Sequence, residues 1–522
     1  MGSIWAMIGV MNITDAPGEP VQADRGAEES LSVFALRPVL IVAGALAAVL
    51  IAFSARYGYH RDELYFIACG RHLAWGYPDQ PPFVPLLARL MTDIAANSVV
   101  VLRLPAALAS AALVVLTGLM ARELGAQRHA QVLAAAAVAV APLVIGAGHL
   151  LSTTTFDLPA WALVTWLVAR ILRTGDQRLW IWVGLAAGAG LFDSDLVAFL
   201  LLAIVAGLAL VGPRRPFCSP WLYVGGVIAL AMWAPYLAWQ ARYGWPELAI
   251  SRSIANGGSG SSTPRWELLP FQIGLLGAAL SPIWITGLVR LFRGGALRWG
   301  RAFGVAYVVL AVVFIATGGK AYYLGGMFPV LVGAGAQPAV DWLRRGRAGA
   351  RAWLLAAAFA LTLTALPLTL PIVPAADLHD TPIVAVNYDA GETLAWPAFV
   401  REIAAVYRSL PAAQRSAAIV LGSNYGESGA VDHFGEADGL PRAYGVHNAY
   451  WYWGPPPQSA SVVVAVGFDR GQLTPVCGTL RLAARLNNHL GVNDDEQGAP
   501  VWVCTERRRP WTATWRGLRE LG

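Results

Sequence analysis

Apolar stretches long enough to form membrane-spanning helices follow one another through most of this 522-residue chain. A helix needs about 20 mostly apolar residues to cross the hydrocarbon core of a bilayer, and about eleven stretches approach this length. They cover 38–54, 99–121, 130–148, 154–168, 179–192, 196–211, 220–239, 268–289, 302–317, 322–342 and 352–370. The two stretches that meet near Gly190 are short, so their assignment as two spans stays open. The chain is predicted to be a polytopic α-helical membrane protein.

Composition divides the chain into three parts. Only 13% of the residues are charged, whereas soluble globular proteins carry about 25%, and the shortage falls on residues 38–371. Residues 1–37 are polar and predicted to be disordered and cytoplasmic, without the charge order and apolar core of a signal peptide. Residues 372–522 have ordinary soluble composition and a normal domain size. We therefore expect a membrane domain at 38–371 and a soluble domain after it.

Arginines in short loops predict the orientation of the spans, because cytoplasmic loops are enriched in Lys and Arg. Alternate loops carry Arg122 and Arg128; Arg170, Arg173 and Arg178; Arg214 and Arg215; Arg290, Arg293, Arg298 and Arg301; and Arg344, Arg345, Arg347 and Arg351. With the N-terminus on the cytoplasmic side of the cytoplasmic (inner) membrane, an odd number of spans places the C-terminal domain outside. This pattern accounts for the net charge of +6, so nucleic acid is not expected as a partner.

The four cysteines have no metal-binding spacing, and no metal ligands are predicted. Cys477 and Cys504 fall in the C-terminal domain, which the orientation places in an oxidising compartment. A disulfide between them and two separately buried cysteines both agree with the sequence.

Ionisable and aromatic residues gather at the outer ends of the predicted spans. The first outer loop reads "ARYGYHRDELYFIACGRHLAWGYPDQPPF" and brings His60, Arg61, Asp62 and Glu63 together. The same face receives His149, Asp157, Asp193, Asp195, Lys320, Tyr322 and Tyr323. Charges near the hydrocarbon boundary are costly unless they pair or serve a site. Their convergence on one face predicts a functional site there.

Each of these residues also has a structural explanation. Asp62 and Glu63 fit the polar face of an interfacial helix, paired with neighbouring arginines. Asp157 fits a helix N-cap before "LPAWALVTW", and tyrosines near a membrane surface commonly anchor helices there. Lys320 is the only lysine among 38 Lys and Arg residues, as expected by chance in a genome that disfavours lysine codons. The shared face favours the functional interpretation.

A carboxylate beside cations at a lipid surface suits the transfer of a sugar from a lipid phosphate to a hydroxyl group. The carboxylate takes the proton of the acceptor hydroxyl, which contributes about 10² to 10⁴-fold to the rate. Fixed Lys or Arg side chains stabilise the charge that grows on the leaving phosphate, and tyrosine hydroxyls donate hydrogen bonds to it. No nucleotide is needed, and we expect no cofactor or at most a weak dependence on a divalent cation.

The stretches "RDELYFIACGRHLAWGYPDQPPFVPLLARL", "VLRLPAALASAALVV" and "STTTFDLPAWALVTW" resemble bacterial glycosyltransferase family 39. Its members are GT-C membrane enzymes related to protein O-mannosyltransferases and lipid A aminoarabinose transferases. The resemblance is close over the first four spans and implies a polyprenyl-phosphate sugar donor, with a glycan, lipid or protein hydroxyl as acceptor. It makes Asp62 the catalytic base, with Glu63 positioning it or sharing its role. The residues expected to hold the donor phosphate are Lys320 of "KAYY", Arg61, Tyr322 and Tyr323, and those expected to orient the substrate are Asp157, Gln80 and His60.

The C-terminal domain is predicted to be α/β. Apolar runs at 382–388, 416–423, 461–468 and 499–505 are predicted as buried strands, with an amphipathic helix at 396–410 between the first two. "NYGESGAVDHFG" and "GVHNAYWYWGPPP" resemble the outer domain of some family members. The aromatic run 450–453 fits either stacking on sugar rings or a cluster buried within the protein.

One stretch departs from the family pattern, because relatives commonly have Asn-Lys where "GLFDSDL" places Asp193 and Ser194. If that lysine normally helps to hold the phosphate, Lys320 and the arginines carry more of this task here, or the activity or donor differs. Two other functions stay open: a transporter or flippase of lipid-linked sugars, and a non-catalytic envelope scaffold. A transporter requires ionisable groups at the centres of its spans, and the scarcity of charge there favours the transferase.

Overall fold

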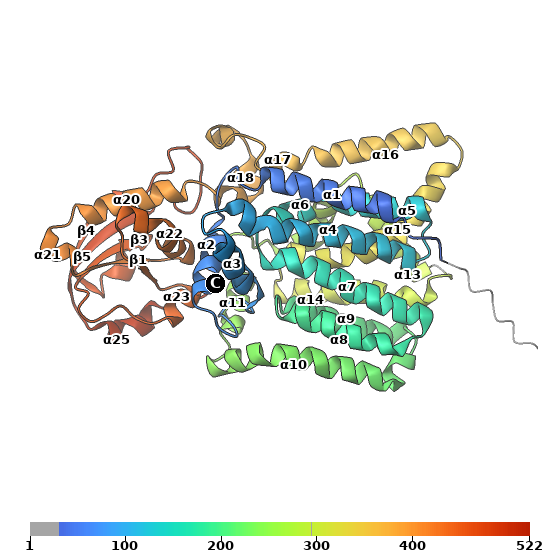
Figure 1. Cartoon of the computed structure of the whole chain (residues 1–522), viewed down its shortest axis with the longest axis horizontal. Coiled ribbons are helices and arrows are strands. Elements are labelled where there is room, and N and C mark those ends of the chain that lie inside the picture. Colours follow the sequence, from blue (N-terminus) through green and yellow to red (C-terminus); the bar gives the residue numbers. More distant parts are fainter. Residues whose placement is uncertain (1–30, 294) are drawn as a thin grey trace, which may run out of the picture.

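The computed structural model describes residues 31–293 and 295–522. A helical membrane domain forms one end of the molecule, and a smaller domain built on a sheet forms the other (Figure 1). The segment predicted to be disordered, 1–37, lies outside the described residues up to position 30. Its last two residues are helical, because α1 begins at Leu36.

The helices of the membrane domain follow the predicted apolar stretches. They are α1 (Leu36–Phe53), α4 (Val99–Glu123), α5 (Arg128–Ala139), α6 (Pro142–His149), α7 (Thr153–Thr174), α8 (Trp180–Leu191), α9 (Leu196–Val211), α10 (Pro220–Arg242), α12 (Leu268–Leu276), α13 (Ser281–Arg293), α14 (Arg301–Thr317), α15 (Phe328–Arg344), α16 (Ala348–Leu363) and α17 (Leu366–Thr369). By length and composition, 6 helices among the described residues can cross a membrane, or up to 8 if two bent pairs each form one span. The protein is a multi-pass membrane protein, and the count of about eleven spans stays a prediction.

The local sequence explains the two bends. Helices α5 and α6 meet at 57° where Pro142 starts the second helix. Since a residue before proline avoids the helical region, Ala141 is extended and interrupts the helix. Helices α12 and α13 meet at 116°, and Gly277 at the end of α12 has a φ of 99°, which favours glycine.

Glycines allow close packing of membrane helices. A Cβ added at Gly287 of α13 would lie 1.8 Å from the carbonyl oxygen of Leu331 in α15. One added at Gly335 of α15 would lie 1.8 Å from the carbonyl oxygen of Ile283 in α13. Because lipid tails are as apolar as the side chains, helix association in a membrane depends on such close contacts.

A buried ion pair fixes α2 (Arg61–Arg71), which lies at the junction of the two domains with α3 (Phe83–Ile94) and α11 (Pro246–Ala255) (Figure 1). The Glu63 side chain is 0% exposed and receives Nε and Nη2 of Arg103, each at 2.7 Å. It also accepts the backbone N–H groups of His60 and Leu151, at 2.8 and 2.9 Å. The start of α2 is thereby tied to α4 and to the segment before α7.

The C-terminal domain contains a five-stranded mixed sheet in the order β2-β1-β3-β5-β4. The strands are β1 (Ala418–Gly422), β2 (Ala443–Gly445), β3 (Val462–Val466), β4 (Cys477–Arg485) and β5 (Pro500–Arg507). Strand β1 is parallel to β2 and β3, and β5 is antiparallel to β3 and β4. Three of the four predicted strands are found, as is the predicted helix, α20 (Trp396–Arg408).

The predicted strand at 382–388 is wrong. This segment forms the short helices α18 (Ile383–Val386) and α19 (Tyr388–Gly391), and α20 therefore precedes the first strand. Short apolar runs do not separate strands from buried helical turns. Here the side-chain amide of Asn387 donates to the backbone carbonyl of Leu368, 2.7 Å away, which holds the segment against the membrane domain.

A disulfide between Cys477 and Cys504 links the edge strand β4 to its neighbour β5. Two rings of the aromatic run 450–453 pack within the protein, and stacking of this run on sugar rings stays a prediction. Tyr450 is buried and its ring lies 4.5 Å from that of Trp453. The Trp453 ring stacks on His72, just after α2, at 4.2 Å.

Helix α22 (Tyr425–Phe434) packs directly on α2. A Cβ added at Gly429 would lie 3.0 Å from the backbone carbon of Leu64, and one at Gly426 would lie 3.1 Å from Cβ of Arg61. The two glycines of "NYGESGAV" thus allow the C-terminal domain to approach α2 closely.

Candidate active site at the domain junction

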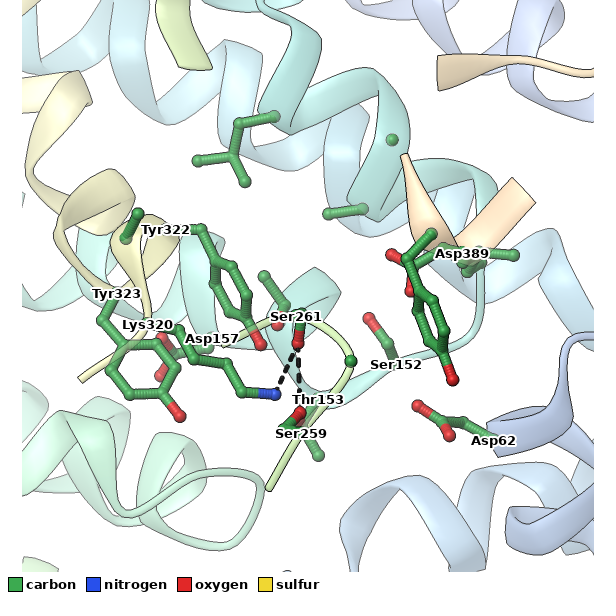
Figure 2. Close-up of a pocket in the computed structure, with 18 of the residues that line it drawn as sticks. Asp62, Ser152, Thr153, Asp157, Ser259, Ser261, Lys320, Tyr322, Tyr323 and Asp389 are labelled. Carbon is green, nitrogen blue, oxygen red and sulfur yellow. Dashed lines mark hydrogen bonds between the residues drawn. The ribbon is translucent and has the colours of Figure 1, made fainter. Parts of the chain in front are cut away.

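A pocket of about 1670 Å³ lies where the C-terminal domain meets the membrane helices. Its walls come from α2, the start of α7, the loop between α8 and α9, residues 258–263, the 3-10 helix η5 (Ala321–Met327) and residues 383–390. Figure 2 shows Asp62 on one side of this space, with Lys320, Tyr322 and Tyr323 on the other. The structure thus brings residues from widely separated parts of the chain to one pocket.

Asp62 is the accessible carboxylate of α2, with its side chain 37% exposed. Its Oδ1 accepts a hydrogen bond of 2.8 Å from the hydroxyl of Tyr425 in the C-terminal domain. Nε of Arg61 lies 3.8 Å from the same oxygen. One oxygen is therefore held by the C-terminal domain while part of the carboxylate stays open.

Glu63 does not line the pocket. Its two oxygens are engaged by Arg103 and by backbone N–H groups, as described above. It positions the start of α2, and with it Asp62, and has no surface on which to contact a substrate.

Arg61 lines the pocket but is neutralised by the C-terminal domain. Its Nη1 lies 3.1 Å from Glu392 and 2.7 Å from Asp495. It also donates to the hydroxyls of Tyr388 and Tyr425. A phosphate would have to compete with two carboxylates for this guanidinium, so the geometry favours Arg61 as a link between domains.

Lys320, in contrast, makes no ion pair within the part of the chain that the structure describes. Its Nζ donates to Oγ of Ser261 at 2.7 Å and lies 5.8 Å from the ring centre of Tyr322 (Figure 2). Ser259 and Ser261 come from the stretch "NGGSGSST", which was not among the predicted site residues. The Gly/Ser-rich composition of this stretch, typical of a loop, was the feature of the sequence from which these two residues could have been predicted.

The N-cap explanation for Asp157 is wrong, because α7 begins at Thr153 with Ser152 as its N-cap. Asp157 lies one turn further on, lines the pocket, and accepts a hydrogen bond of 3.0 Å from Nε1 of Trp161. Tyr322 and Tyr323 are partly buried in the same pocket, and their rings are nearly perpendicular at 5.2 Å.

His60 connects α2 to the pocket wall formed by the C-terminal domain. Its Nδ1 accepts the N–H of Asp62 at 3.1 Å, and its Nε2 lies 3.6 Å from Asp389. Burial by itself lowers the pKa of His60, but the carboxylates of Asp62 and Asp389 outweigh it and raise the pKa above the usual value. Burial likewise opposes ionisation of Asp389, and His60 reverses this, so that the pKa of Asp389 is lowered.

No group of three or more His, Cys, Asp or Glu side chains among residues 31–293 and 295–522 is placed to hold a metal ion. Independence from metal stays a prediction, because a cation held partly by substrate needs fewer protein ligands.

Comparisons with known proteins agree with the expected fold. Residues 79–239 match the model of the family described as dolichyl-phosphate-mannose-protein mannosyltransferase. No curated protein matches the sequence. The solved structure of ArnT from Cupriavidus metallidurans bound to undecaprenyl phosphate is similar, with 16% identity and a TM-score of 0.55. The apo state of that protein has 14% identity and a TM-score of 0.57, and both alignments cover 89% of this chain and 97% of ArnT.

A weaker similarity is to the archaeal oligosaccharyltransferase AglB from Archaeoglobus fulgidus, with 14% identity and a TM-score of 0.46 over 78% of this chain and 63% of AglB. The likeness to ArnT, at low sequence identity, extends over nearly the whole of both chains. It confirms the GT-C fold: a polytopic helical membrane domain followed by a small C-terminal domain with a sheet.

Proposed function

We propose that this protein is a membrane glycosyltransferase that moves a sugar from a polyprenyl phosphate to a hydroxyl group at the outer face of the cytoplasmic membrane. The observation that carries the proposal is that Asp62 and Lys320 line opposite walls of one pocket. The Asp62 carboxylate is accessible, and Lys320 makes no ion pair with any described residue. The match to the mannosyltransferase family and the undecaprenyl phosphate bound by ArnT support a lipid-linked donor.

In this proposal, Asp62 accepts the proton of the acceptor hydroxyl as its oxygen attacks the anomeric carbon of the donor. The bond between that carbon and the phosphate oxygen breaks, and the configuration at the carbon is inverted. Lys320 stabilises the charge left on the phosphate, with Tyr322 and Tyr323 as further donors. Glu63 contributes through the position of α2, and His60 and Arg61 connect this helix to the C-terminal domain.

The decisive experiment is transfer by the full-length Asp62→Asn variant in lipid nanodiscs, with a polyprenyl-phosphate sugar as donor. Loss of the base is expected to lower the transfer rate about 10² to 10⁴-fold, with thermal unfolding unchanged. Asp93→Asn is the matched control, because Asp93 lies on α3 and its one ion pair among residues 31–293 and 295–522 is with Arg89 at the surface. Full activity in Asp62→Asn would rule out this residue as the base.

A further inference from the structure

The loop between α8 and α9 presents a carboxylate that nothing in the proposed mechanism uses. Asp193 is 2% exposed and lines the pocket. Neither of its side-chain oxygens has a hydrogen-bond partner among the described residues. A buried carboxylate without a partner costs several kcal/mol or more, so this position suits a group that a ligand supplies.

Two further polar side chains line the same pocket. The amide nitrogen of Gln80, whose residue is 4% exposed, also has no hydrogen-bond partner within the described residues. The backbone N–H of Phe83 donates to the carbonyl of Phe192 at 3.1 Å, which joins the Gln80 loop to the Asp193 loop. Asp157 faces the same pocket with one oxygen bonded to Trp161.

The chemistry of these groups selects the ligand. An ammonium group would satisfy the two carboxylates, but it has no lone pair to accept the N–H of the Gln80 amide. A hydroxyl group both donates and accepts. Neighbouring hydroxyls on a ring therefore satisfy a carboxylate and an amide together, which a single cation does not.

On the basis of the proposed function, we propose that Asp193, Gln80 and Asp157 form the subsite that binds the hydroxyl groups of an uncharged sugar on the lipid donor. The phosphate of that donor is then held elsewhere in the pocket, at Lys320, because Asp193 and Gln80 offer it no positive charge. In this proposal Asp193 of "GLFDSDL" binds the sugar and does not contact the phosphate.

The test measures binding of three probes to the full-length protein in nanodiscs: undecaprenyl phosphate, undecaprenyl phosphate carrying a neutral hexose, and undecaprenyl phosphate carrying an amino sugar. We expect the wild type to bind the neutral glycolipid most tightly. Asp193→Ala and Gln80→Ala should each weaken that binding about tenfold and leave undecaprenyl phosphate unaffected. Lys320→Ala should weaken all three probes alike.

Asp193→Asn keeps the side-chain volume and, should Asp193→Ala not fold, is expected to show the same selectivity. Equal losses for the glycolipid and the bare carrier, no loss, or a wild-type preference for the amino sugar would each overturn the subsite. A wild type that binds none of the three probes would instead refute the proposed function, and the subsite with it.

Discussion

Replacing Glu63 by Gln removes one charge from the buried ion pair that anchors α2. Both side chains are inaccessible, at 0% for Glu63 and 2% for Arg103, so water cannot screen the charge that is left. Removing one partner of such a pair costs about 3–5 kcal/mol. We expect the equilibrium constant for unfolding to rise about 10² to 10⁴-fold.

The assay is denaturant unfolding of the full-length protein in detergent micelles, followed by tryptophan fluorescence. Glu123→Gln is the matched control, because Glu123 is also buried but its partner Arg173 is 31% exposed and binds it at 2.6 Å. Water reaches that arginine, so we expect a loss of about 1 kcal/mol. An unchanged stability of Glu63→Gln together with lost transfer would refute the reasoning and make Glu63 a catalytic residue.

Three further predictions concern the lysine, the disulfide and a histidine of α22. Lys320→Arg keeps the charge but replaces a compact ammonium by a broad fork, so the affinity for the lipid donor, measured in nanodiscs, should fall. Reducing the bond between Cys477 and Cys504, which joins residues 27 positions apart, should lower the free energy of unfolding of the C-terminal domain by about 3.5 kcal/mol. Burial, aided by Arg71, lowers the pKa of His433 from 6.5 to about 4. Because the unfolded chain then binds more protons than the native one, stability should fall by at most about 3 kcal/mol as the pH drops from 6.5 to 4, and His433→Gln should reduce this fall.

Each of these predictions has a result that would contradict it. Unchanged donor affinity in Lys320→Arg would mean that the site does not require a lysine at this position. Equal stability of the oxidised and reduced protein would mean that β4 stays on the sheet without its covalent link. Identical pH profiles for the wild type and His433→Gln would mean that the pKa of His433 is not lowered in the folded protein.

Hydropathy predicted where the helices of the membrane domain lie, because each apolar stretch carries its own signal, but it did not predict that 130–148 and 268–289 are each divided between two helices. The site was predictable only in part. Asp62 and Lys320 were found from their place at the ends of spans, and both line the pocket. Glu63 meets Arg103 across 40 positions, and Arg61 meets Asp495 across 434. No local pattern announces such pairs, which decide whether a charged residue serves the substrate or the fold.

The packing of α22 on α2 has a consequence for engineering. The hydroxyl that holds Asp62 belongs to Tyr425, and the glycines beside it are what bring it within reach. A truncated chain that ends after the last membrane helix would keep Asp62 but leave it without this restraint. A chimera that exchanges outer domains between relatives must therefore exchange α2 and α22 together.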